Sequence, residues 1–180
     1  MPRVLIITPT YNERENLPEL AVGIFAELPE ANLLVVDDAS PDGTGDVADD
    51  MASADPRVHV VHRAGKRGLG TAYLAGFAWA IERGYDYILQ MDADLSHDPR
   101  HLPDFIRALD EGADLAIGSR NIPGGGVEGW GPLRHFISKG ASVYSRKILG
   151  LGIHDLTSGY KAFRRTVLQS IDLAAVTSRG

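Results

Sequence analysis

Short apolar runs alternate with longer segments of helical periodicity along the first two thirds of the chain. Apolar runs bounded by turn residues predict strands at residues 4–8, 33–36, 58–62, 85–91 and 115–118. Apolar positions three and four residues apart predict helices at about 16–28, 44–53, 69–83 and 99–111. Each helical segment is long enough for a right-handed crossover between parallel strands. The pattern therefore predicts an α/β domain with a mostly parallel, Rossmann-like sheet flanked by helices.

A further helix is predicted at about 132–149, after a run of three glycines at 124–126. One stripe of this helix is apolar, with Leu133, Phe136, Ile137, Tyr144 and Ile148. The opposite stripe is polar, with Arg134, Ser138 and Ser145. A polar stripe of this kind fits either an ordinary solvated face or a binding surface.

Composition narrows the classes of protein. The chain has 180 residues, of which 44% are apolar, and this fits one domain with its own core. It has no cysteine, which excludes disulfides, thiolate metal sites and cysteine nucleophiles. No apolar stretch approaches the roughly 20 residues of a spanning helix, and the start lacks the pattern of a signal peptide. We therefore expect a cytoplasmic protein that does not cross a bilayer.

Charge is divided unevenly along the chain. Residues 1–119 carry 21 acidic and 9 basic side chains, whereas residues 120–180 carry 3 acidic and 9 basic ones. An acidic part suits a divalent cation, and a basic part attracts phosphate on a small ligand, a lipid or a membrane surface. Uneven solvation of two faces explains the division equally well.

Ligands of open parallel sheets bind beyond the carboxyl ends of the strands. Four of the predicted strands are followed there by polar or charged residues that could contact a ligand. Asp92 and Asp94 follow the fourth strand, where an extended backbone would point both carboxylates the same way. Such a pair suits Mg²⁺ or Mn²⁺, whose remaining ligands are commonly water and substrate phosphates. The diphosphate of a nucleotide would need such a cation. The alternative is a chance Asp-x-Asp in which Asp94 caps the next helix.

The first two strands also end in candidate ligand contacts. After the second strand, Asp37 and Asp38 can accept hydrogen bonds from a base or from ribose hydroxyls, although one of them could be structural. After the first strand, Tyr11 offers a stacking face and Glu13 an acceptor, in a loop that Pro9 stiffens. The turn at 40–44 suggests structural roles for its own Asp and Thr residues.

Two weaker motifs suggest other classes. Three glycines within residues 65–70 resemble a shifted dinucleotide-binding fingerprint, which makes a nicotinamide dehydrogenase the competing class. These glycines follow the third predicted strand rather than the first, and Lys66 and Arg67 interrupt them. His97 and His101 are four residues apart, but a helix start between them favours surface or capping roles over zinc binding.

Taken together, the motifs resemble those of the dolichol-phosphate (polyprenol-phosphate) mannose synthases, which are inverting family 2 glycosyltransferases with a GT-A fold. The matching segments are Thr8-Pro-Thr-Tyr-Asn-Glu-Arg-Glu-Asn16, Val36-Asp-Asp-Ala-Ser-Pro-Asp-Gly-Thr44, Met91-Asp-Ala-Asp-Leu-Ser-His97 and Gly118-Ser-Arg120. The resemblance continues through 125–130, 137–140 and 155–159 and so covers nearly the whole chain. These later segments are the more specific ones.

The resemblance assigns roles by position. It places the nucleotide-sugar pocket on Pro9, Tyr11, Glu13, Val36, Asp38, Asp92 and Ala93. It makes Asp94 the principal ligand of Mg²⁺ or Mn²⁺, beside Asp92. Ser96 stands where some relatives have a glutamine ligand, so its own contact with metal is weak, water-mediated or missing. The acceptor phosphate is placed on Arg120, Arg134 and Ser138.

The implied reaction is a single displacement, in which a polyprenyl phosphate oxygen attacks the anomeric carbon of GDP-mannose and GDP leaves. The attacking phosphate is largely ionised near pH 7, since its second pKa is about 6, and therefore needs no general base. The resemblance also implies peripheral contact with the cytoplasmic face of a membrane, a membrane-anchoring partner protein and no nucleic acid. A related transferase using another donor, such as UDP-glucose, is the nearest alternative.

Relatives of this family continue beyond the position of Gly180, with an aromatic-rich helix and a later basic segment. We therefore expect residues 1–180 to be one glycosyltransferase catalytic domain that is truncated at its C-terminal end or completed by another polypeptide. A noncatalytic nucleotide-sugar-binding module is the alternative if the native protein ends there.

Overall fold

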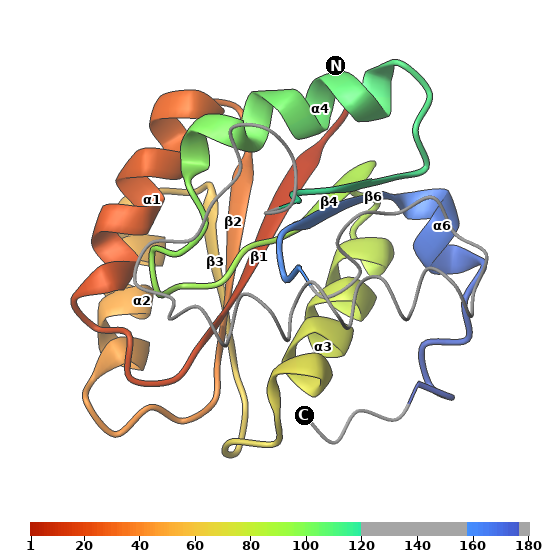
Figure 1. The fold of residues 1–180 in the computed structure, drawn as a ribbon. Helices are drawn as coiled ribbons and strands as arrows, with labels where there is room; N and C mark the ends of the chain where they lie inside the picture. The colour runs from red at the N-terminus through yellow and green to blue at the C-terminus, as the bar shows by residue number, and fades with distance from the viewer. Residues whose placement is uncertain (120–157, 177–180) are drawn as a thin grey trace, which may run out of the picture.

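The computed structural model describes residues 1–119 and 158–176. The described strands form one six-stranded sheet in the order β3-β2-β1-β4-β6-β5 (Figure 1). They are β1 (Val4–Thr10), β2 (Asn32–Asp37), β3 (Val58–His62), β4 (Tyr87–Gln90), β5 (Leu115–Ile117) and β6 (Lys161–Arg164). The helices are α1 (Asn16–Glu27), α2 (Thr44–Ala54), α3 (Leu69–Glu82), the short 3-10 helix η1 (Pro99–His101), α4 (Leu102–Asp110) and α6 (Arg165–Gln169).

The sheet is parallel on one side and mixed on the other. β1 pairs in parallel with β2 and β4, and β2 pairs in parallel with β3. β6 lies antiparallel between β4 and β5. The predicted α/β fold and mostly parallel sheet are confirmed, and each predicted strand within residues 1–119 is present with shifted ends at most. β6 and α6 were not predicted, and the predicted helix at 132–149 lies outside the described residues.

Helices cover both faces of the sheet, as Figure 1 shows. Alternate residues of the central strands point to opposite faces, so Ile6 and Leu33 pack with α1, α2 and α4, whereas Leu5 and Leu34 pack with α3 and α6. All four of these side chains are fully buried. Burial on both faces explains why β1 and β2 have continuous apolar runs rather than an alternating pattern.

Helix α3 packs closely against the central strand β1. A Cβ atom at Gly76 would come within 2.6 Å of Ile7 Cγ2 in β1, closer than two carbon atoms can pack. Glycine at this position therefore lets the helix backbone rest against the strand. None of the described helices combines the length and the apolar character needed to cross a membrane.

Candidate functional site

The carboxyl ends of three neighbouring strands carry most of the predicted site. β1 lies between β2 and β4 in the sheet, so the loops that follow these strands share one edge. Tyr11 and Glu13 follow β1, Asp38 follows β2, and Asp92 and Asp94 follow β4. Positions that are far apart in sequence are thus delivered to the same side of the domain.

Asp37 and Asp38 have different environments although they are adjacent. Asp37 is 2% exposed, and its carboxylate accepts hydrogen bonds from the Thr10 hydroxyl and from both the amide and the hydroxyl of Ser40. These bonds join the ends of β1 and β2, so Asp37 is the structural member of the pair. The Asp38 backbone amide donates to the Thr10 carbonyl at 3.1 Å, whereas its side chain contacts Arg63.

The Asp38 carboxylate forms a buried ion pair with Arg63, the residue after β3. Arg63 Nη1 lies 2.9 Å from Asp38 Oδ1, and the two side chains are only 12% and 8% exposed. Among the described residues, neither of these two atoms has a hydrogen-bond partner of good geometry, so their contact is mainly electrostatic. Arg63 Nη2 also donates to the Thr71 hydroxyl at 2.6 Å, which ties the pair to the first turn of α3.

The loop after β1 is held in place by the start of α2. The Glu13 amide donates to the Thr44 hydroxyl at 3.0 Å, and Thr44 is fully buried. Asp42 accepts from the amide and hydroxyl of Thr44, and the hydroxyl bond lowers the pKa of Asp42. Asp42 and Thr44 are thus structural, as the turn at 40–44 predicted. The Glu13 carboxylate accepts from the Asn16 side chain at 2.8 Å and is half-buried.

Tyr11 lies in the loop after β1 as expected, whereas Pro9 does not. Tyr11 is 37% exposed as a residue, and its ring lies under the ammonium of Lys66, whose Nζ is 4.1 Å from the ring centroid. Pro9 lies inside β1 rather than in the loop after it, which corrects the expectation that it stiffens that loop. A central strand tolerates this proline because the missing donor faces β4, whose pairing with β1 has already ended at Ile7.

Asp92 is held from two sides by the protein. Its Oδ1 accepts a hydrogen bond of 2.6 Å from the Tyr73 hydroxyl of α3. Its backbone amide donates to Nδ1 of His97 at 3.0 Å. Burial, followed by the charges of Asp92 and Asp94, raises the pKa of Tyr73 well above 10, so this hydroxyl remains protonated and donates.

The segment before β6 packs against the loop at 91–98 between β4 and η1, called the Asp92 loop below. A Cβ atom at Gly159 would lie 2.9 Å from Asp92 Oδ2, so a larger residue here would have to displace the carboxylate. The next residue, Tyr160, stacks on the His97 ring with centroids 4.7 Å apart. Its hydroxyl donates to the Asp98 carbonyl at 3.2 Å, and burial raises its pKa. His97 is therefore a packed member of the site wall, which corrects its expected surface or capping role.

Asp94 lies on the outer side of the same loop. Strand β4 ends at Gln90, so Asp92 and Asp94 occupy a turn in which Leu95 has a positive φ of 59°. The expectation of an extended backbone at these residues was wrong. Asp94 is exposed, and its Oδ1 accepts from the amide of Ser96, which is also exposed. The helix cap expected as the alternative is supplied instead by Asp98 at η1.

Two predicted pocket residues are deeply buried. Val36 is fully buried and packs on the α3 side of the sheet. Ala93 is 3% exposed and packs on the opposite side. A ligand contact at either position would therefore go to the backbone. Arg120, Arg134 and Ser138 lie outside the described residues.

The described carboxylates can supply part of a metal coordination shell. Within residues 1–119 and 158–176, no three His, Cys, Asp or Glu side chains gather closely enough to hold an ion by themselves. Mg²⁺ and Mn²⁺ often take one or two protein carboxylates and complete the shell with substrate phosphates and water. An exposed Asp94 beside Asp92 fits this mode, because none of the described residues donates to the second oxygen of Asp94.

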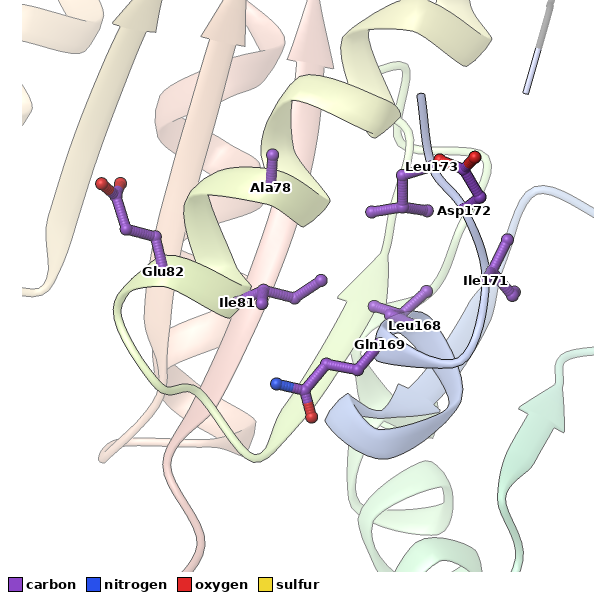
Figure 2. A pocket seen from close by; sticks show the side chains of 8 residues that line it. All are labelled: Ala78, Ile81, Glu82, Leu168, Gln169, Ile171, Asp172 and Leu173. Carbon is purple, nitrogen blue, oxygen red and sulfur yellow. The ribbon is translucent and has the colours of Figure 1, made fainter. Parts of the chain in front are cut away.

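An open groove lies away from these loops, between the second half of α3 and α6 (Figure 2). It is lined by Ala78, Ile81, Glu82, Leu168, Gln169, Ile171, Asp172 and Leu173. Its lining is mainly aliphatic, and none of the predicted site residues belongs to it. The groove therefore offers no chemistry for the site.

Arg63 and Tyr73 contact predicted site residues but were not identified from the sequence. Arg63 directly follows β3 and therefore occupies the same strand-end position that drew attention to Asp38 and Asp92. Applying the strand-end rule to the third strand would have found it. Tyr73 lies on the apolar stripe of α3 with Phe77 one turn later, and nothing in this pattern distinguishes it from an ordinary core residue.

Comparison with known proteins relates this arrangement to a family. Residues 5–172 match glycosyl transferase family 2. The chain is 58% identical over 179 residues to the polyprenol monophosphomannose synthase of Mycolicibacterium smegmatis, a match that covers 99% of this chain and 68% of the relative. It is 53% identical over 178 residues to the undecaprenyl-phosphate mannosyltransferase of Micrococcus luteus, covering 99% and 73% respectively.

The fold also has solved counterparts. A mannosyltransferase from Pyrobaculum calidifontis, in complex with GDP-Man and Mn²⁺, matches with a TM-score of 0.62 and 21% identity. That match covers 94% of this chain and 46% of the solved one, and it shows the shared GT-A fold. Because the family match spans nearly the whole chain and two relatives share more than half of its aligned residues, the chain belongs to glycosyl transferase family 2, among the polyprenol-phosphate mannose synthases.

Proposed function

We propose that this domain binds GDP-mannose at the carboxyl ends of β1, β2 and β4 and transfers mannose to a polyprenyl phosphate with inversion. The observation that carries the proposal is the delivery of Glu13, Asp38 and the Asp92 loop to one edge by three adjacent strands. The names of the relatives, which share 58% and 53% identity with this chain, support mannose and a polyprenyl phosphate as substrates.

The nucleoside part of the donor is assigned to the loops after β1 and β2. Tyr11, which is 37% exposed, is assigned to stacking on the base, and the Asp38 carboxylate, held by Arg63, is assigned to hydrogen bonding with the nucleoside. Glu13 supplies a further half-buried acceptor. The neighbouring Pro9, Val36 and Ala93 would shape the pocket through their backbone, since the last two side chains face the core.

The diphosphate is assigned to the Asp92 loop. Asp94 and Asp92 would hold Mg²⁺ or Mn²⁺, and Ser96 is close enough in sequence to contribute through water. Such an ion neutralises the charge that develops on a leaving diphosphate. The part of the protein is to hold the loop that carries these carboxylates, and the hydrogen bond from the Asp92 backbone amide to His97 Nδ1 contributes to this.

The acceptor phosphate is assigned to Arg120, Arg134 and Ser138, and this assignment rests on the family resemblance. Guanidinium groups suit the role because they can bind phosphate oxygens in a bidentate manner. An ionised phosphate needs no protein base, so the catalytic contribution lies in positioning the two substrates and balancing their charge. We further propose that the domain acts at the cytoplasmic face of a membrane, where its lipid acceptor resides, with an anchoring partner protein.

Isothermal titration calorimetry with and without Mn²⁺ tests donor binding. We expect GDP-mannose to bind in a Mn²⁺-dependent manner, with UDP-glucose weaker and NADH not bound. Asp94→Asn should remove the Mn²⁺ dependence, whereas Asp50→Asn, at an exposed position of α2, should preserve it. Transfer of mannose to polyprenyl phosphate by the full-length native protein then tests the reaction. Equal binding of GDP-mannose to the wild type and to Asp94→Asn would exclude the metal role.

A further inference from the structure

Tyr73 of α3 reaches the predicted donor site from the core on the α3 side of the sheet. Tyr73 is only 5% exposed. Its ring belongs to the core on the α3 side of the sheet and stacks on Phe77, with the ring centroids 6.3 Å apart. The hydroxyl at the end of this fixed ring donates to Asp92 Oδ1 at 2.6 Å. A side chain anchored in the core therefore ends on a carboxylate of the donor loop.

The other atoms of Asp92 are constrained as well. Its Oδ2 packs against Gly159, where a Cβ atom would come within 2.9 Å of it, and lies 4.0 Å from His97 Nε2. With Oδ1 held by Tyr73, the carboxylate has one defined orientation although its side chain remains 29% exposed. The loop itself is a turn rather than an extended strand, so its backbone alone does not fix the side chain.

We propose that Tyr73 is a positioning residue that holds the Asp92 carboxylate in the orientation used for Mn²⁺-dependent donor binding. This inference rests on the proposed function and extends it to a residue of α3. The tyrosine ring alone would satisfy the packing, because phenylalanine has the same ring and lacks only the oxygen. The hydroxyl is therefore the part of the side chain whose role can be tested separately.

The test compares Tyr73→Phe with Tyr87→Phe. Tyr87 is a matched control because it is 7% exposed and its hydroxyl also donates to a carboxylate, Asp110 Oδ1, at 2.7 Å. Asp110 ends α4 and belongs to no part of the donor site. Each substitution therefore removes one part-buried phenol–carboxylate hydrogen bond, but only Tyr73→Phe does so at Asp92.

Two binding measurements on the full chain serve as readouts: calorimetric titration of GDP-mannose in saturating Mn²⁺, and Mn²⁺ titration followed by electron paramagnetic resonance in the presence of GDP. We expect Tyr73→Phe to weaken both by about tenfold, the lower end for a lost hydrogen bond to a charged group. Tyr87→Phe should leave both within about twofold of the wild type.

A double-mutant cycle with Asp92→Asn separates positioning from general destabilisation. If Tyr73 acts through Asp92, Tyr73→Phe should cost little further donor affinity once Asp92 has been changed. Unchanged binding in Tyr73→Phe, equal losses in both phenylalanine variants, or an undiminished loss in the Asp92→Asn background would each overturn the inference. Failure of the wild type to bind GDP-mannose would instead refute the proposed function on which the inference depends.

Discussion

Replacing Arg63 with methionine should destabilise the domain far more than its position in a loop suggests. Arg63 is 12% exposed and forms the ion pair with Asp38 at 2.9 Å. Methionine keeps most of the aliphatic length but removes the charge and the donor to the Thr71 hydroxyl. Asp38, which is 8% exposed, would then be a buried carboxylate without its counter-charge.

The expected loss follows from the burial of both partners. Removal of one partner from a buried ion pair typically costs about 3–5 kcal/mol. We expect about 3 kcal/mol here, because the Arg67 amide still donates to Asp38 Oδ2, although at a long 3.4 Å. For a chain of this size, about 1 kcal/mol lowers the melting temperature by about 2–4 °C, so Arg63→Met should lower it by about 6–12 °C.

Urea denaturation followed by circular dichroism measures this loss directly. The control is Arg107→Met, since Arg107 pairs with Asp104 at 2.5 Å but the two side chains are 67% and 56% exposed. That exposed pair should contribute at most about 1 kcal/mol. Asp38→Asn combined with Arg63→Met should recover part of the stability, because no buried charge is left unpaired. A loss in Arg63→Met no larger than in Arg107→Met would refute the reasoning.

Two further predictions concern the core and the pH dependence of stability. Gly76→Ala should lower the free energy of unfolding by about 1–3 kcal/mol, because its methyl group would lie 2.6 Å from Ile7 Cγ2; thermal denaturation beside the exposed Ala78→Gly control tests this. Burial, Arg83 and Arg3 lower the pKa of His59 from its usual 6.5, so the unfolded chain binds this proton more tightly. The stabilisation is complete above about pH 6.5 and is lost as the pH falls through the folded pKa, and His59→Gln should therefore flatten the urea profile between about pH 7 and pH 5.

The parallel part of the fold was predictable because its signals are local. β1 and β2 are continuous apolar runs, and α1 and α3 begin close to where periodicity placed them. β6 was missed because its four residues, Lys161–Arg164, include a charged side chain at each end and one fully buried alanine. Its pairing with β4 joins positions about 75 residues apart, and no local pattern reports such a contact.

The candidate site was predictable as a set of positions but not as a set of contacts. The strand-end rule identified Asp38 and Asp92, whose roles remain proposals. It gave no means of telling Asp37, which is saturated by hydrogen bonds, from Asp38, which pairs with Arg63. That difference depends on where a third strand and a third helix lie, which the sequence pattern alone does not specify.

The glycines that suggested a dinucleotide fingerprint have a different explanation in the structure. Gly65 and Gly68 have φ values of 154° and 94°, and between β3 and α3 they permit a loop that few other residues could form. This loop places Lys66 over Tyr11 and brings the Arg67 amide towards Asp38. The loop between β3 and α3 thus contacts the two residues assigned to the nucleoside, Tyr11 and Asp38, through the Lys66 ammonium and the Arg67 backbone amide. The positive charge of Lys66 offsets part of the acidic charge at this edge. The glycines that resembled a dinucleotide fingerprint thus shape a loop that would present a cation to the anionic donor proposed here.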